Sequence, residues 1–112
     1  MKDSMTLNEY GKLALESAVY GVGNKINYPV LGLIGEAGEL ANKYKKILRD
    51  DNGILTEVKR EEMIMELSDV LWYCAALAND LGTDLNSVCV KNIAKLRDRQ
   101  ARNVINGSGD NR

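Results

Sequence analysis

A chain of 112 residues, 45% apolar and 28% charged, with one proline and no phenylalanine, is expected to form one helical domain with a single modest core. Its net charge of −1, with lysine and arginine spread along the chain, argues against a nucleic-acid partner and against a polybasic membrane surface. Because the chain has no histidine, histidine-based acid–base catalysis and histidine-containing di-iron bundles are excluded.

The first predicted helix runs from about Thr6 to Tyr20. Its start, Thr6-Leu7-Asn8-Glu9, has the form of a capping box, and apolar residues follow at helical spacing. Glycine and asparagine residues and one proline then break the pattern, which predicts a loop over Gly21–Pro29. This loop either only connects two helices or also shapes a ligand pocket.

A second helix is predicted after Pro29, with apolar residues repeating every three or four positions for five turns, as in a core-facing helix. Glu36 and Glu39 lie at the edge of this apolar stripe. Because they are three residues apart, their carboxylates are neighbours on one face. Gly35 and Gly38 interrupt the helix although glycine costs about 1 kcal/mol against alanine in a helix interior, which suggests close packing there.

A third helix is predicted after a cap at Thr56, and it carries a second acid pair, Glu66 and Asp69, at the same spacing. Residues 70–78 are apolar on every face, so this helix should be buried on several sides and should partly meet another subunit. Tyr73, one turn after Asp69, either packs in the core or lines the mouth of a pocket.

A fourth helix is predicted from about Asp84, with a basic far half. Lys91, Lys95 and Arg99 recur every fourth residue and so line one strip, which is either a solvated face or a phosphate-facing surface. The same two interpretations apply to Lys43 and Lys46 on the second helix.

The C-terminal residues 104–112 are rich in glycine and asparagine, which predicts a flexible tail after one helical domain over residues 1–103. Cys74 and Cys89 lack the paired spacing of a zinc site and are predicted to be reduced core thiols, as in a reducing cytoplasm. Neither a signal peptide nor a membrane-spanning run is recognisable in the sequence. We therefore expect a cytoplasmic protein.

The two acid pairs carry the functional hypothesis. Two helices lying side by side would aim four carboxylates at one point, where like charges repel unless a cation lies between them. Oxygen ligands favour a hard cation such as Mg²⁺, for which Mn²⁺ could substitute. With 16 acidic residues, about two such pairs are expected by chance, so the count does not decide between a metal site and a solvated edge. The apolar neighbours of these acids favour the metal site. The acids concerned are Glu36, Glu39, Glu66 and Asp69.

Three motifs resemble a known family. Gly35-Glu36-Ala37-Gly38-Glu39-Leu40, followed by Glu66-Leu67-Ser68-Asp69-Val70-Leu71-Trp72-Tyr73, resembles the E-x-x-E…E-x-x-D signature of MazG-like nucleotide pyrophosphohydrolases. Lys91-Asn92-Ile93-Ala94-Lys95-Leu96-Arg97 is similar to the basic closing motif of that family. The resemblance covers the chain from about Tyr28 to Arg102.

The resemblance implies an all-α fold of four-helix-bundle type, assembled as a homodimer or homotetramer. It also implies Mg²⁺-dependent cleavage of a nucleoside triphosphate to the monophosphate and pyrophosphate, in nucleotide-pool housekeeping. The roles implied by position are metal ligation and catalysis by Glu36, Glu39, Glu66 and Asp69, phosphate contact by Lys91 and Lys95, and nucleoside contact by Tyr73. Lys43, Lys46 and Arg99 are further candidate phosphate contacts.

Two alternatives stay open. A related enzyme could act on another nucleotide, such as a phosphoribosyl nucleotide, with a similar bundle. The chain could also be a non-catalytic helical interaction module whose acids are solvated. The Gly21–Pro29 loop carries no matching motif, so the base preference of an enzyme is left open.

Overall fold

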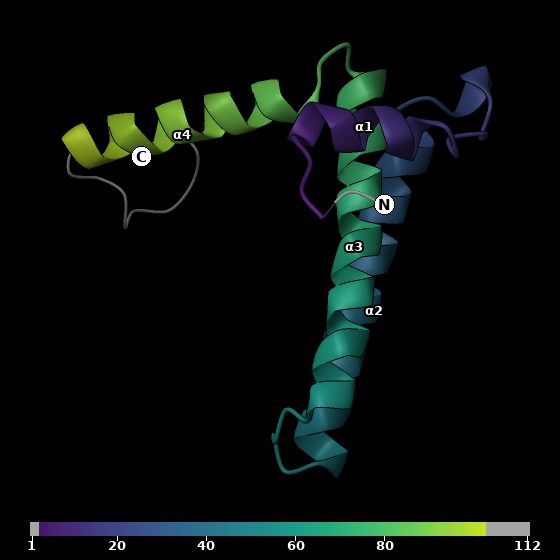
Figure 1. Ribbon diagram of the computed structural model, residues 1–112, viewed down its shortest axis with the longest axis vertical. Coiled ribbons are helices and arrows are strands. Elements are labelled where there is room, and N and C mark those ends of the chain that lie inside the picture. Colours follow the sequence, from purple (N-terminus) through teal and green to yellow (C-terminus); the bar gives the residue numbers. More distant parts are fainter. Residues whose placement is uncertain (1–2, 103–112) are drawn as a thin grey trace.

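The computed structural model describes residues 3–102 of the protein, and all regular structure within them is helical (Figure 1). The predicted all-α fold is therefore confirmed over the described residues, whereas the predicted tail at 104–112 lies outside them. None of the described helices is long and apolar enough to cross a membrane. The elements are α1 (Leu7–Leu15), a short 3₁₀ helix (Val22–Asn24), α2 (Asn27–Asp50), α3 (Glu57–Asp80) and α4 (Leu85–Ala101).

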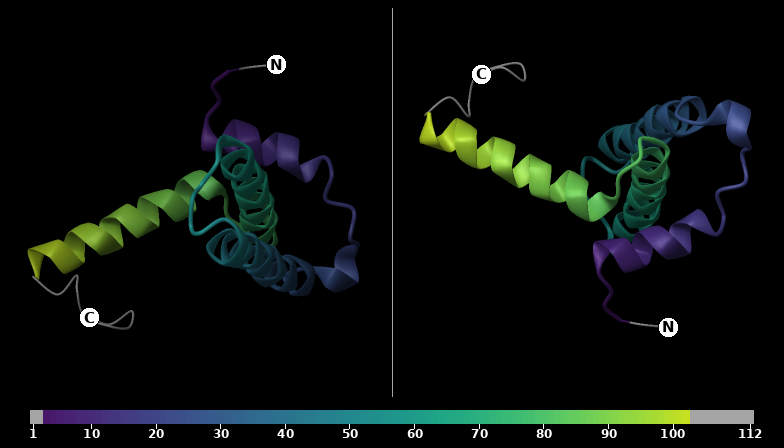
Figure 2. Two further views of the ribbon diagram at one scale, coloured as in Figure 1. Left: turned by 90° about the horizontal axis from the view of Figure 1, so that it is seen from below. Right: turned by 90° about the horizontal axis from the view of Figure 1, so that it is seen from above.

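The centre of the fold is a hairpin of α2 and α3, which lie side by side along their length (Figures 1 and 2). The turn between them uses two residues with positive φ, Asn52 and Gly53, and the Gly53 N–H donates to the Ile47 carbonyl at 3.1 Å. This bond closes the end of α2. Thr56 caps α3 as predicted, since its Oγ1 accepts from the Lys59 N–H at 3.2 Å.

Helix α1 begins as predicted but ends five residues early. The capping box is present: the Thr6 N–H donates to Glu9 Oε1 at 2.9 Å, and the Glu9 N–H donates to Thr6 Oγ1 at 3.1 Å. At the other end, the Ala14 carbonyl accepts from Ser17 Oγ at 2.9 Å and from Trp72 Nε1 at 3.1 Å. The prediction of a helix to Tyr20 was wrong because these bonds satisfy the carbonyl that another turn would need.

Helix α2 begins at Asn27, not after Pro29 as predicted. Pro29 lies in the first turn and is buried. An N–H at this position would have no partner inside the helix, so proline is tolerated there. The connecting segment is therefore residues 16–26, with the 3₁₀ helix within it.

Helix α4 contacts α1 and α3 near its first turns and then extends away from them (Figures 1 and 2). Its start is fixed by Asp84, whose Oδ1 accepts from the Ser87 N–H at 2.8 Å. The core of the described chain lies where α1, α3 and α4 meet, and its buried residues are Ala14, Ala75 and Leu85.

The α2–α3 hairpin keeps much of its apolar surface exposed within one chain. Only Pro29 and Ile47 of α2 are buried, and Leu31 is 70% exposed. The prediction of a core-facing α2 was wrong for a single chain, because α4 turns away and covers neither helix of the hairpin along its length. For the same reason Cys89 on α4 is exposed, contrary to its prediction as a core thiol, whereas Cys74 is half-buried.

The close approach that glycine permits in α2 is at Gly32. A Cβ at Gly32 would overlap the ring of Tyr73 from α3. A Cβ at Gly35 or Gly38 would meet nothing within 4 Å in the described chain, so the close packing expected at those two glycines is not found there.

We expect Gly32→Ala to lower the free energy of unfolding by about 1–3 kcal/mol, because the added methyl group displaces the Tyr73 ring. Gly11→Ala in α1 is the matched control, since a Cβ there meets nothing within 4 Å. It should leave stability unchanged or raise it by up to about 1 kcal/mol. Urea denaturation measures both changes, and equal effects of the two substitutions would contradict the Gly32–Tyr73 contact.

Candidate functional site

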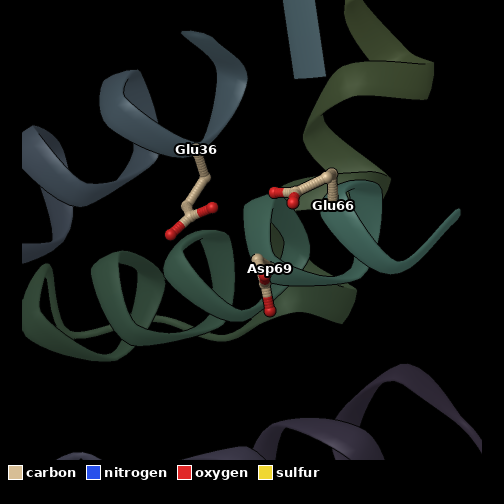
Figure 3. Close-up of side chains that lie close together, drawn as sticks. All are labelled: Glu36, Glu66 and Asp69. Atoms are coloured by element: carbon tan, nitrogen blue, oxygen red, sulfur yellow. The ribbon is translucent and has the colours of Figure 1, made fainter. Parts of the chain in front are cut away.

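Three of the four predicted acids converge between α2 and α3. Glu36 from α2 and Glu66 and Asp69 from α3 each offer a carboxylate oxygen, and these oxygens all lie within 4.8 Å of one another (Figure 3). Glu66 and Asp69 share one face of α3 because they are three residues apart. Glu39, also predicted for this cluster, is exposed on α2 and lies outside the group.

The acids interact unfavourably with one another in the absence of a cation. The pKa of Glu36 is raised above its ordinary value of 4.5, first by partial desolvation and then by the negative charges of Asp69 and Glu66. Lys43 Nζ lies 3.9 Å from Glu66 Oε1, so Lys43 forms an ion pair across the hairpin. The sequence could not indicate this partner, because spacing reveals only contacts within one helix.

One cavity adjoins this cluster, and a second cavity shares Trp72 with it. The first has a volume of about 350 Å³ and is lined by Glu36, Asp69, Trp72 and Tyr73. The second has a volume of about 230 Å³ and is lined by Ser17, Val19, Tyr20, Asn24, Tyr28 and Trp72. The acids therefore lie beside Trp72 and Tyr73, which together with Tyr20 and Tyr28 form an aromatic wall.

The aromatic wall is a connected set of rings. Tyr20 stacks on Tyr28 with centroids 4.8 Å apart, Tyr28 lies 6.1 Å from Tyr73, and Trp72 meets Tyr73 edge to face at 5.0 Å. Trp72 Nε1 is held by the Ala14 carbonyl and by Ser17 Oγ at 3.0 Å. These contacts fix the orientation of the rings.

Tyr73 both packs against a neighbouring helix and lines a cavity, the two roles that the sequence allowed for it. Its ring packs on Gly32 and is half-buried, and it also lines the cavity beside the acids. Burial raises the pKa of Tyr73, and Tyr28 and the charges of Glu36 and Asp69 raise it further. The hydroxyl therefore keeps its proton at neutral pH and can donate a hydrogen bond.

The other predicted basic residues do not line these two cavities. Lys46 is exposed on α2, Lys91 and Lys95 are exposed on α4, and Arg99 is buried on α4. Helix α4 extends away from the hairpin that carries the acids (Figures 1 and 2).

Sequence reasoning missed most of the aromatic wall. Trp72 could have been found, since it follows Asp69 by three residues and therefore shares its side of the helix. Asn24 and Tyr28 carry no such signal, because their place beside Trp72 depends on where the connecting segment folds.

Comparison with known proteins shows what the chain is similar to. The sequence profile of the family described as "MazG nucleotide pyrophosphohydrolase domain" matches residues 27–104. The "Gene 37 protein" of Mycobacterium phage L5 is 46% identical over 114 residues, covering 96% of this chain and 100% of that protein. No solved structure matches the chain significantly.

The family resemblance predicted from the acid motifs is thereby confirmed. Members of this family typically depend on a divalent metal ion. The cluster of Glu36, Glu66 and Asp69 fits such an ion, because it offers only carboxylate oxygens and its like charges need a counter-ion.

We expect Glu66→Gln to lower the pKa of Glu36 in metal-free protein, because one of the charges that raise it is removed. A carboxyl group with a raised folded-state pKa stabilises the fold below its ordinary pKa of 4.5 and loses that contribution as pH rises through the raised value. The mutant should therefore lose less stability than wild type as the pH is raised from 4 toward neutral.

Carboxyl NMR titration and melting curves in EDTA measure these two effects. Glu61→Gln is the control, since Glu61 is an exposed α3 acid whose ion pair is with Arg60. An unchanged Glu36 pKa in Glu66→Gln would contradict the coupling.

Proposed function

Because the chain belongs to the family of MazG nucleotide pyrophosphohydrolase domains, we propose that it hydrolyses a (deoxy)nucleoside triphosphate to the monophosphate and pyrophosphate in the presence of Mg²⁺. The observation that carries this proposal is the convergence of three carboxylates beside an aromatic-lined cavity. Such a site combines a cation position for the phosphates with flat rings for the base. A cytoplasmic role in nucleotide-pool housekeeping is part of the proposal.

Glu36, Glu66 and Asp69 are the residues that would hold Mg²⁺, or Mn²⁺ in its place. When bound, the ion would supply neutralisation of the charge that develops on the phosphates during cleavage. Glu39, one turn along α2, would join the site through its charge, which also raises the pKa of Glu36.

The protein groups have distinct tasks in this proposal. One acid of the cluster takes the proton from the attacking water, and no covalent nucleophile is required. Lys43, already beside Glu66, would contact a phosphate oxygen and balance its charge. Lys46, one turn further along α2, is a second candidate for the end of the phosphate chain.

The nucleoside would lie against Trp72, Tyr73 and Tyr28. Their rings are held at fixed angles to one another, so a base can stack on them without ordering them first. Base–aromatic stacking is worth about 1–3 kcal/mol per base, which is enough to orient the nucleoside while the acids hold the phosphates.

A second copy of the chain would cover the exposed face of the hairpin. Leu31 and Ile34 on α2 are 70% and 65% exposed, and Leu67 and Leu71 on α3 are 55% and 39% exposed. Exposed apolar residues in such number mark an interaction surface. Two hairpins packed on these faces would complete a four-helix bundle, as a homodimer or as half of a homotetramer.

Assembly also gives α4 a task. Because α4 leaves its own hairpin, the exposed Lys91 and Lys95 would contact phosphates in the site of a second copy, whereas Arg99 is buried on α4. This assignment keeps the two lysines of the strip predicted on α4 and places their contacts in a neighbouring chain.

Wild-type protein with Mg²⁺ should convert a nucleoside triphosphate to monophosphate and pyrophosphate in equal amounts, and EDTA should abolish turnover. Glu66→Gln should lower kcat by about 100-fold or more, because the amide replaces a carboxylate that balances charge in the transition state. Glu61→Gln should keep full activity. Chromatography of the products measures all three, and release of orthophosphate in place of pyrophosphate would contradict the proposal.

The two alternatives differ in their outcomes. Turnover of a phosphoribosyl nucleotide but of no nucleoside triphosphate would identify the related enzyme. A folded protein that binds neither Mg²⁺ nor nucleotide in calorimetry would be an interaction module.

Leu31→Asp should separate the oligomer into monomers, because it places a charge on the apolar face of the hairpin. In an isolated chain the same change at a 70% exposed position should move stability by less than about 0.5 kcal/mol. Val22→Asp, at an 81% exposed position outside the hairpin, is the control and should stay oligomeric. Sedimentation velocity measures the assembly, and full turnover by a monomer would contradict the role given to α4.

A further inference from the structure

Most of the wall of the second cavity comes from the segment between α1 and α2 and from the first turn of α2. One carboxylate ties this part of the chain to the end of α3. We propose that Asp80 is a positioning residue for nucleoside binding, which holds residues 20–28 in the conformation that places Tyr28 and Asn24 against Trp72. The inference rests on the proposed function, because it concerns the nucleoside end of that site.

Asp80 lies in the last turn of α3 and joins two points of the segment. Its Oδ2 accepts a hydrogen bond from the Tyr20 hydroxyl at 2.8 Å and another from the Ile26 N–H at 2.9 Å. These donors stand before and after the 3₁₀ helix, so one carboxylate oxygen fixes both ends of it. Hydrogen bonds to a charged acceptor are stronger than those between neutral groups.

The bond to Ile26 supports a strained turn. Ile26 has φ 65° and ψ −53°, and the Asn27 N–H donates to the Lys25 carbonyl at 2.6 Å, which together make a three-residue γ-turn with positive φ. A β-branched residue rarely adopts positive φ. Strain of this kind persists only where the surroundings impose it, and it gathers at functional sites.

The turn determines where the wall residues lie. Tyr28 follows Ile26 by two residues and stacks on Tyr20 at 4.8 Å, and Asn24 Nδ2 donates to the Tyr20 carbonyl at 2.9 Å. Tyr20 therefore connects Asp80 to Asn24 and Tyr28, which line the second cavity with Trp72.

The Tyr20 hydroxyl stays a donor over the working pH range. Burial, followed by the hydrogen bond and charge of Asp80, raises the pKa of Tyr20 to about 12.

Asp80 is separate from the acid cluster. It does not belong to the group of converging carboxylates, which consists of Glu36, Glu66 and Asp69, and it does not line the cavity beside them. Its removal should therefore affect the nucleoside end of the site and leave the phosphate end intact.

We expect Asp80→Ala to raise KM for a nucleoside triphosphate by about tenfold or more and to leave kcat within about twofold of wild type. Inhibition by inorganic tripolyphosphate, a probe with phosphates and no nucleoside, should not change. Trp72 is the only tryptophan, so its fluorescence reports binding of a nucleoside monophosphate in EDTA, and this response should weaken with Asp80→Ala.

Three further variants separate positioning from general stability. Asp80→Asn keeps an acceptor oxygen and should restore part of the affinity. Tyr20→Phe removes one of the two hydrogen bonds to Asp80 and should raise KM less than Asp80→Ala does. Tyr20→Phe also tests the proposal if Asp80→Ala does not fold. Asp84→Ala removes the cap of α4 without touching the segment, and it should leave KM unchanged.

An unchanged KM in Asp80→Ala, or a loss of tripolyphosphate inhibition equal to the loss of nucleotide affinity, would overturn the role of Asp80. If wild type turns over no nucleotide, the pyrophosphohydrolase proposal fails. The Trp72 fluorescence titration still tests whether Asp80 positions the nucleoside site. If no nucleoside monophosphate changes the fluorescence of wild type, the role of Asp80 is overturned as well.

Discussion

The mutual repulsion of Glu36, Glu66 and Asp69 is the constraint on which the rest of the structure depends. Their oxygens lie within 4.8 Å of one another because α2 and α3 pair along their length, and that pairing must outweigh the repulsion when no cation is present. The tight turn at Gly53 and the cap at Thr56 hold the register of the hairpin from one end. The site is thus a locally unfavourable arrangement that a rigid pair of helices maintains, as a cation site requires.

Local sequence signals predicted the parts of the fold that local bonds determine. The starts of α1, α3 and α4 were found because Thr6, Thr56 and Asp84 cap them within four residues. The end of α1 and the start of α2 were wrong because bonds from distant residues of α3 decide them: Trp72 at the Ala14 carbonyl and Asp80 at the Ile26 N–H. The acid spacing was readable, whereas the cross-hairpin partner of Lys43 and the part of the aromatic wall contributed by Tyr20 and Tyr28 were not.

Apolar periodicity identifies a face to be covered but not the chain that covers it. The pattern of α2 predicted a core-facing helix, and in one chain Leu31 and Ile34 are nonetheless exposed. The same limit applies to α4, whose Cys89 follows an apolar pattern and is exposed. If two copies of the chain complete the core between them, a helix can carry the apolar pattern of a core-facing helix and still be exposed within one chain.

Helix α3 carries both ends of the candidate site. Asp69 belongs to the acid cluster, Trp72 and Tyr73 line the cavity next to it, and Asp80 holds the segment that closes the wall. Since a helix rises about 1.5 Å per residue, the eleven residues from Asp69 to Asp80 set a fixed axial separation of about 16 Å between the acids and the anchor of the wall. The phosphate end rests on two helices, whereas the nucleoside end rests on a strained turn. Changes in residues 20–28 can therefore alter the shape of the wall while the geometry of the acids is conserved by the hairpin.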